Sequence, residues 1–278
     1  MKVTLWGTRG SLPTPGPETT RYGGNTSCVE VRGRDGSVVV LDAGSGIRRL
    51  GAAIGPEVPR VDLLLSHLHL DHIEGLGFFA PLFRRGLEVH IWGPASTTLD
   101  LRARLSRILS PPIFPVRLRD LPCQLELHDV TSIDRFEIGA LEIRAALVCH
   151  PGPTLGFRIN EGRASLTYLP DHEPSLGSVD FPRNPDWTSG FDLAADTDLL
   201  IHDSQYSHEE YGARVAWGHS ALADLVDFAT ASRAARVVPF HYDPDHTDAE
   251  LDRRFEEARR TPMPFDFVPA IEGASFDL

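Results

Sequence analysis

Four residues that can bind metal follow one apolar run of the sequence. Residues 61–65 read Val-Asp-Leu-Leu-Leu, and His67, His69, Asp71 and His72 come just after them. The run has the length and aliphatic content of a buried strand, in which residues two apart project to the same side, so His67 and His69 could share one ion. Asp71 and His72 follow where the chain must turn, and they could bind a second ion. Because clustered titratable groups are costly unless a cation neutralises them, the segment predicts half of a two-metal site.

The alternative interpretation is a polar loop that is rich in histidine by chance, because the chain has 12 histidines. Similar residues at the ends of other apolar runs argue against it. They are Asp42 after residues 39–41, His150 after 146–148, Asp171 after 167–169, His202 and Asp203 after 199–201, and His241 after 238–240. Strand ends converge at one edge of a sheet, where loops carry the chemistry. A single such histidine is more often a packed core residue, but together these residues indicate a shared site.

The elements that must position these residues are predicted from the apolar runs and their turn signals. Strands are predicted at residues 3–6, 25–31, 37–41, 61–65, 87–92, 136–142, 143–148, 154–159, 164–168, 199–201 and 237–240. Amphipathic helices are predicted at residues 95–109, 220–232 and 248–260, and another helix is expected to begin within 73–79. The Pro-rich residues 111–124 are expected to be irregular, and residues 173–192 form a loop that could act as a lid.

Composition limits the class of protein. With 278 residues, 41% of them apolar, the chain can bury the core of one large α/β domain spanning residues 1–278. The formal charge is −12 and Lys2 is the only lysine, which disfavours polyanions such as transfer RNA. Cys28, Cys123 and Cys149 form no Cys-x-x-Cys pair, so neither a disulfide framework nor a thiolate zinc site is predicted. We expect a cytoplasmic protein with no membrane partner, because no signal peptide or membrane span is recognisable, and a homo-oligomer is compatible with the sequence.

These residues resemble the metallo-β-lactamase superfamily, in its phosphodiesterase branch, which includes ribonuclease Z and the cyclic phosphodiesterases. The motifs that carry the resemblance are Asp42, His67-Leu68-His69-Leu70-Asp71-His72, His150 within residues 148–159, Asp171 and His241. The resemblance covers most of the chain. It implies an α/β fold, an αββα sandwich of two mixed β-sheets flanked by helices.

The resemblance also implies a ligand set for two metal ions. The implied ligands are His67, His69 and His150 for one ion, Asp71, His72 and His241 for the other, and Asp171 as a bridge between them. Asp42 would orient a ligand histidine or the bridging water from behind. Three imidazoles with shared oxygens leave an open position, which is typical of a catalytic rather than a structural zinc site. Zinc suits these ligands best, and manganese or iron remains open.

Two divalent ions about 3.5–4 Å apart would lower the pKa of a bridging water, so that a hydroxide could attack a phosphodiester near neutral pH. Asp71 is expected to act in catalysis as well as in metal binding. No serine or cysteine lies in a sequence typical of a nucleophile. The expected chemistry is therefore hydrolysis by water.

Two further segments, residues 199–206 and 217–220, resemble ribonuclease Z segments in which an acidic residue partners a histidine. The resemblance implies that His219, oriented by Asp203, protonates the leaving group, although His219 could instead pack against the helix at 220–232. Asp203 stands where ribonuclease Z usually has Glu, and no stretch resembles the glycine-rich arm that grips transfer RNA. Arg9 and Arg21, in loops that resemble those of the smaller phosphodiesterases, could clamp a phosphate, although loop arginines are more often only solvated.

The expected function is a metal-dependent phosphodiesterase, a dinuclear hydrolase of a small or cyclic phosphodiester such as a cyclic nucleotide. One alternative is a ribonuclease acting on short or single-stranded RNA ends. A second is a thioesterase or lactonase of the same fold, for which His219 would be dispensable. A third, a non-enzymatic sensor of a metal or ligand, requires an incomplete site, whereas all seven expected ligand positions are filled.

Overall fold

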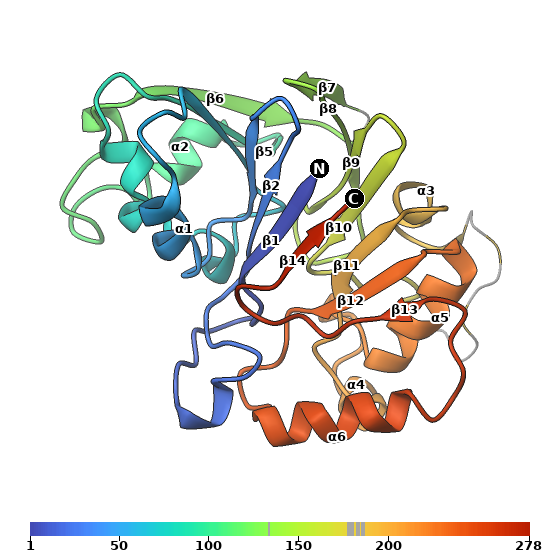
Figure 1. Ribbon diagram of the computed structural model, residues 1–278. Coiled ribbons are helices and arrows are strands. Elements are labelled where there is room, and N and C mark those ends of the chain that lie inside the picture. Colours follow the sequence, from blue (N-terminus) through green and yellow to red (C-terminus); the bar gives the residue numbers. More distant parts are fainter. Residues whose placement is uncertain (133, 177–180, 182–183, 185–186) are drawn as a thin grey trace.

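The computed structural model describes residues 1–132, 134–176, 181, 184 and 187–278 (Figure 1). Within these residues, two seven-stranded sheets have the orders β14-β1-β2-β3-β4-β5-β6 and β13-β12-β11-β10-β9-β8-β7. The strands of the first sheet are β1 (Lys2–Gly7), β2 (Cys28–Arg32), β3 (Val38–Leu41), β4 (Arg60–Leu64), β5 (Glu88–Pro94), β6 (Gln124–Val130) and β14 (Ser275–Asp277). Those of the second are β7 (Arg135–Ile138), β8 (Leu141–Leu147), β9 (Leu155–Glu161), β10 (Ala164–Leu169), β11 (Leu199–Asp203), β12 (Arg236–Phe240) and β13 (Asp266–Phe267).

Helices cover the outer faces of both sheets (Figure 1). The α-helices are α1 (Ile47–Ala53), α2 (Leu101–Leu105), α3 (Phe191–Ala194), α4 (His208–Tyr211), α5 (Leu222–Ser232) and α6 (Asp248–Ala258). Apolar residues of α1 and α2 pack on the first sheet, and those of α3 and α5 pack on the second. The result is the αββα sandwich expected from the resemblance, and that fold class is confirmed.

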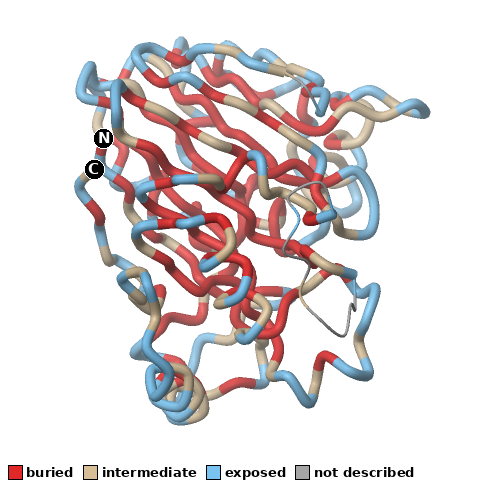
Figure 2. The backbone as a smooth tube through the Cα atoms, turned by 90° about the vertical axis from the view of Figure 1, so that its right-hand side faces the viewer, coloured by how far each residue is buried: buried red, intermediate tan, exposed pale blue. Residues whose placement is uncertain are grey.

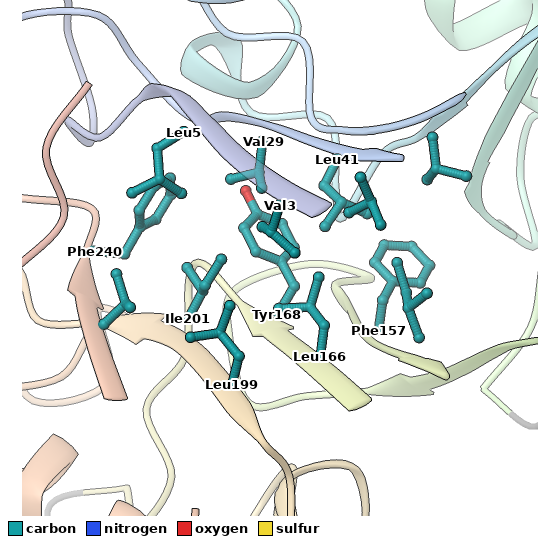
Figure 3. Packing of buried hydrophobic residues seen from close by; sticks show 14 of the residues in the cluster. Val3, Leu5, Val29, Leu41, Phe157, Leu166, Tyr168, Leu199, Ile201 and Phe240 are labelled. Carbon is teal, nitrogen blue, oxygen red and sulfur yellow. The ribbon is translucent and has the colours of Figure 1, made fainter. Parts of the chain in front are cut away.

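The main core lies between the two sheets. Its labelled members in Figure 3 are Val3, Leu5, Val29, Leu41, Phe157, Leu166, Tyr168, Leu199, Ile201 and Phe240, all of them fully buried. Burying one such side chain contributes about 1.5–3 kcal/mol, so this layer is a large stabilising term. In β3, Leu41 faces this core and Val40 faces the helices. That two-sided burial explains why the strand is continuously apolar rather than alternating.

Parallel pairing places the site residues at one edge. Strands β3 to β6 run parallel in the first sheet, and β10 to β13 run parallel in the second. The carboxyl ends of β3, β4, β10, β11 and β12 lead into Asp42, His67, Asp171, Asp203 and His241. Because parallel strands end on the same side of their sheet, both sheets deliver these residues to one region.

Two predicted helices are wrong in extent. The helix expected to begin within residues 73–79 is replaced by short 3-10 turns at Leu70–His72, Leu76–Phe78 and Ala80–Phe83, because Gly75 and Gly77 interrupt the segment. The helix expected at residues 95–109 is reduced to α2, whose N-cap Asp100 accepts a hydrogen bond from the backbone N–H of Ala103. Strands β6, β13 and β14 and helices α1, α3 and α4 were not predicted. In the loop expected at 173–192, residues 177–180, 182–183 and 185–186 lie outside the described residues, and so does the lid prediction.

Buried residues follow the strands, and exposed residues gather in the outer loops and on the outer faces of the helices (Figure 2). The two chain ends lie together, since the amino group of Met1 donates a hydrogen bond to the carbonyl of Leu278 at 3.0 Å. Among the described residues, no helix is long and apolar enough to cross a lipid bilayer.

Candidate metal centre

All seven residues expected to bind metal come together where the strands end. They form two groups, one of His67, His69, His150 and Asp171 and one of Asp71, His72 and His241. Six of the seven have side chains that are at most 9% exposed, and His69 is the exposed one. The structure therefore places these side chains in the arrangement that two ions would require.

The first group surrounds one oxygen of Asp171. Its Oδ2 lies 3.6 Å from the Nε2 atoms of both His67 and His150. His150 Nε2 lies 3.1 Å from His69 Nδ1. Ligand atoms of a tetrahedral zinc ion are about 3.3 Å apart, given Zn–N bonds of about 2.0–2.1 Å. These separations match a single ion held by three imidazoles and one carboxylate oxygen.

The second group surrounds the other oxygen of the same carboxylate. Asp171 Oδ1 lies 2.9 Å from His72 Nε2 and 3.2 Å from His241 Nε2. Asp71 Oδ2 lies 3.3 Å from His72 Nε2 and 3.2 Å from His241 Nε2. Each oxygen of Asp171 thus faces a different set of ring nitrogens, which is the geometry of a bridging ligand.

Hydrogen bonds on the outer ring nitrogens fix which nitrogen faces the cluster. His150 Nδ1 donates to the carbonyl of Gly218 at 2.8 Å, His241 Nδ1 to Gln205 Oε1 at 3.1 Å, and His72 Nδ1 to Asp42 Oδ2 at 2.8 Å. In the neutral imidazole the proton on Nδ1 leaves the lone pair on Nε2, the atom that points inward. Such outer partners are a regular feature of histidine ligands to metals.

Asp42 lies behind the cluster and is completely buried. Besides His72, its carboxylate accepts hydrogen bonds from the backbone N–H of Ser66 at 2.7 Å, from Ser66 Oγ and from Tyr168 Oη, both at 2.8 Å. Because Ser66 Oγ donates to Asp42, it accepts from His67 Nδ1 at 3.0 Å. Asp42 therefore orients two ligand histidines, one of each group.

The unpaired ring nitrogen and the carboxylate charges of the cluster are suited to bind cations. His67 Nε2 is buried, yet it has no hydrogen-bond partner among the described residues. Burial, together with the positive charge of His72, lowers the pKa of His67 well below its usual value, which favours the neutral form that binds metal. Burial would also lower the pKa of His72, but the charges of Asp171, Asp71 and Asp42 raise it well above its usual value. The carboxylates thus favour positive charge at this point, as bound ions would provide.

Three residues at this edge have a backbone conformation that is rare outside glycine. Ser11, Asp42 and His241 all have positive φ, at 60°, 59° and 60°, which residues other than glycine rarely adopt. Ser11 donates its backbone N–H to Asp71 Oδ2 at 2.7 Å. The neighbouring Gly10 packs so tightly that a Cβ atom there would lie 2.3 Å from the ring of His241. The loop at Gly10 and Ser11 therefore supports two of the three residues of the second group, Asp71 and His241.

The partly buried His219 and the fully buried Asp203 form a pair beside the cluster. His219 Nδ1 donates to Asp203 Oδ2 at 2.7 Å, and its ring stacks on that of His241 with centroids 5.1 Å apart. The backbone N–H groups of Gln205 and Ser220 donate to the other oxygen of Asp203 at 2.9 and 3.2 Å. Burial opposes protonation of His219, but the charge and hydrogen bond of Asp203 outweigh it and raise the pKa of His219 to about 9.

The two arginines expected to clamp a phosphate do not face the cluster. Arg9 is completely buried, and its guanidinium donates to the carbonyls of Gly23, Asp243 and His246. Its role is to tie the first loop to the segment after β12. Arg21 is exposed and pairs with Asp252 of α6. The phosphate-clamp expectation is therefore wrong for Arg9, which no solvent reaches, and has no support at Arg21.

Three residues of the site had no role in the sequence interpretation. Gln205 and Gly218 hold ligand histidines, as described above, and Glu173 anchors the segment that contains Gly218. The buried carboxylate of Glu173 accepts hydrogen bonds from Tyr211 Oη at 2.7 Å, from the Ala216 N–H at 3.0 Å and from the Gly218 N–H at 2.9 Å. Gln205 and Glu173, two residues after Asp203 and Asp171, offered a positional signal in the sequence. Gly218 offered none, because it acts through its backbone carbonyl and N–H.

Comparison with known proteins supports a common fold and family. A family model described as the β-lactamase superfamily domain matches residues 38–242. Ribonuclease Z from Haloarcula marismortui is 24% identical over 304 residues, covering 93% of this chain and 91% of that protein. The crystal structure of the short form of human tRNase Z has a TM-score of 0.68 at 20% identity, covering 100% of this chain and 99% of the other. A diphosphatase from the PhnP family gives a TM-score of 0.68 at 18% identity, with 100% and 97% covered.

Proposed function

This chain belongs to the β-lactamase superfamily and is a metal-dependent hydrolase, and from this premise we propose that it cleaves phosphodiester bonds. The preferred substrate is a small or cyclic phosphodiester such as a cyclic nucleotide. The single observation that carries this proposal is the hydrogen bond between His219 Nδ1 and Asp203 Oδ2, which is 2.7 Å long and lies beside the carboxylate of Asp171. A phosphodiester with an alcohol leaving group needs such a proton donor. A thioester does not, because a thiolate leaves readily without a proton, its conjugate acid having a pKa of about 8.5.

The ligand set would be His67, His69 and His150 for one ion, Asp71, His72 and His241 for the other, and Asp171 between them. When bound, two divalent ions supply Lewis acidity that activates water and neutralises charge on the phosphoryl oxygens. Five imidazoles with two carboxylates suit zinc, and manganese or iron is the alternative. Asp42 keeps His67 and His72 in the ligand tautomer through the contacts given above.

His219 supplies the proton that the leaving alkoxide requires. Asp203 holds the proton on Nδ1, and the raised pKa of His219 keeps Nε2 protonated as well at neutral pH, so Nε2 is the donor. The hydrogen bond from the Gly218 N–H to Glu173 holds the segment that carries His219. The imidazole of His219 therefore keeps its orientation during the reaction. The stack of His219 on His241 places the donor beside the second group of ligands.

Transfer RNA is the second candidate substrate. The matched relatives include ribonuclease Z and human tRNase Z, so the comparisons do not support the expectation that transfer RNA is disfavoured. Two observations favour the smaller substrate. The formal charge of the chain is −12, and the two loop arginines are engaged with other parts of the protein. A polyanion would therefore gain little attraction at long range.

A substrate panel tests the proposal. We would assay the zinc-loaded and manganese-loaded protein on bis(p-nitrophenyl) phosphate, cyclic nucleotides, cyclic ribose phosphates, short RNA, precursor transfer RNA, thioesters and β-lactams. We expect turnover of bis(p-nitrophenyl) phosphate and of at least one cyclic or dinucleotide phosphodiester. Processing of precursor transfer RNA at a matching rate would overturn the preference for small substrates. Turnover of thioesters alone would overturn the phosphodiesterase proposal.

A further inference from the structure

A second histidine cluster lies away from the candidate metal centre. It consists of His90 on β5 and of Glu126 and His128 on the edge strand β6. In the sheet, His90 is aligned with Asp62 of β4, five residues before His67. At about 3.3 Å per extended residue, the cluster is on the order of 15 Å from that ligand. It therefore shares no residue with the two groups described above.

We propose that His90, Glu126 and His128 form an additional metal site that takes Zn²⁺ or a similar borderline divalent ion such as Cu²⁺ or Ni²⁺. Two imidazoles and one carboxylate are a donor set that zinc uses in proteins with a water as fourth ligand, and imidazole also suits copper and nickel. The ligands come from neighbouring strands that the sheet already holds in register, since His90 is aligned with Glu126. The site is therefore largely assembled before an ion arrives.

The donor atoms are close to the separations that one ion requires. His90 Nδ1 lies 2.9 Å from His128 Nε2. Glu126 Oε2 lies 3.7 Å from His90 Nδ1 and 4.0 Å from His128 Nε2. Around a tetrahedral zinc ion these separations would be about 3.3 Å. The two nitrogens must move apart by a few tenths of an ångström, and the Glu126 oxygen must approach by a similar amount.

The required movements are available to these side chains. The ring planes of His90 and His128 are parallel within 5°, and the ring of His128 stacks on Trp92 with centroids 3.8 Å apart. Rotation of His128 within its own plane would redirect its lone pair towards an ion and keep the stack. Glu126 is 65% exposed and free to turn inward. One histidine must also move its proton to the other ring nitrogen, a shift that water at this partly exposed position can mediate.

Charges on the same face favour a cation. Asp62 and Glu126 are neighbours of His90, and Glu88 lies two residues before it on the same side of β5. Arg60 is the positive group nearby, and its Nε and Nη2 atoms each donate to the carboxylate of Asp62 at 2.7 Å. The ion pair of Arg60 with Asp62 is neutral as a unit, so the two glutamates remain to balance a divalent ion.

Metal analysis of the full-length protein tests the proposal. Wild-type protein, Glu126→Gln and the matched control His208→Ala would be equilibrated with the same free Zn²⁺, and bound zinc per chain would be measured by mass spectrometry. Glu126 and His208 are both exposed, so neither change should disturb folding. We expect Glu126→Gln to bind one ion fewer than the wild type, or to weaken that ion at least tenfold, while His208→Ala matches the wild type.

The indole of Trp92 provides a second measurement, because it stacks on His128. Cu²⁺ should quench part of the tryptophan fluorescence of the wild type, and this part should be absent in both Trp92→Phe and His128→Ala. Hydrolytic activity of the Glu126→Gln protein should remain unchanged, which separates this site from the candidate metal centre. Equal zinc content in wild type and Glu126→Gln, or equal quenching with and without His128, would show that the cluster is only a hydrogen-bonded histidine pair and would overturn the proposal.

Discussion

Replacement of His219 by alanine is the change that best separates proton donation from packing. The imidazole of His219 donates to Asp203 at 2.7 Å and has a pKa raised to about 9, against an ordinary value of 6.5. That difference corresponds to about 3 kcal/mol in favour of the protonated form. The hydrogen bond with Asp203 therefore favours, at neutral pH, the protonated form that a leaving alkoxide needs.

The expected loss depends on the leaving group. Removal of a general acid typically lowers a rate by about 10²- to 10⁴-fold, which is about 3–5 kcal/mol of transition-state stabilisation. We expect a loss of this size for His219→Ala on a diester with an alkyl alcohol leaving group. On bis(p-nitrophenyl) phosphate the loss should be less than about tenfold, because p-nitrophenolate departs without a proton.

The assay compares kcat/KM on both substrates for wild type, His219→Ala and the exposed control His208→Ala, with metal content and melting temperature measured for each. The pH dependence gives an independent check. The protonated donor is present below its pKa and is lost as pH rises towards about 9, so the wild-type rate on the alkyl diester should fall over that range and the variant rate should not. Equal losses on both substrates, or an unchanged rate on the alkyl diester, would refute proton donation by His219.

Three further predictions follow from the described contacts. Asp171→Ala should lose at least one bound metal ion, as measured by elemental analysis, because its two oxygens face different groups of ring nitrogens; full metal content would contradict a bridging role. Gly10→Ala should lower activity at least about tenfold by displacing His241, whereas Gly16→Ala, with open space around it, should not. Burial raises the pKa of Glu210, but its hydrogen bonds outweigh burial and lower that pKa to about 2. The ionised carboxylate of Glu210 therefore stabilises the fold above about pH 4.5, and this stabilisation is lost as pH falls towards 2. Melting curves of Glu210→Gln should accordingly depend less on pH in that range than those of the wild type.

The strands and the strand-end ligands could be predicted because their signals are local. Asp42 and His241 each follow a continuous apolar run, and both faces of the central strands are buried, so the run and its end are visible in the sequence. Strand β14 was missed for the opposite reason. It has three residues, and it is a strand only because it pairs with β1 at the other end of the chain.

The arginines show where residue type alone misleads. Arg9 lies in a glycine-rich and proline-rich loop, which favours an exposed side chain, yet carbonyls at residues 243 and 246 enclose it. Those partners are more than 230 residues away in sequence, and backbone carbonyls carry no residue signal. The same limit applies to Gly218, whose carbonyl orients His150. Long-range contacts through the backbone decide these roles, and no local pattern reports them.

The most direct test is the activity of metal-free protein during restoration with zinc. Protein treated with a chelator would be titrated with Zn²⁺ while the hydrolysis of bis(p-nitrophenyl) phosphate and the bound metal are followed together, for wild type and for Asp171→Ala. We expect no turnover without metal, turnover that requires two ions at the centre in the wild type, and none in Asp171→Ala at any zinc concentration. Hydrolysis that persists without metal, or that is equal in Asp171→Ala, would contradict a two-metal phosphodiesterase.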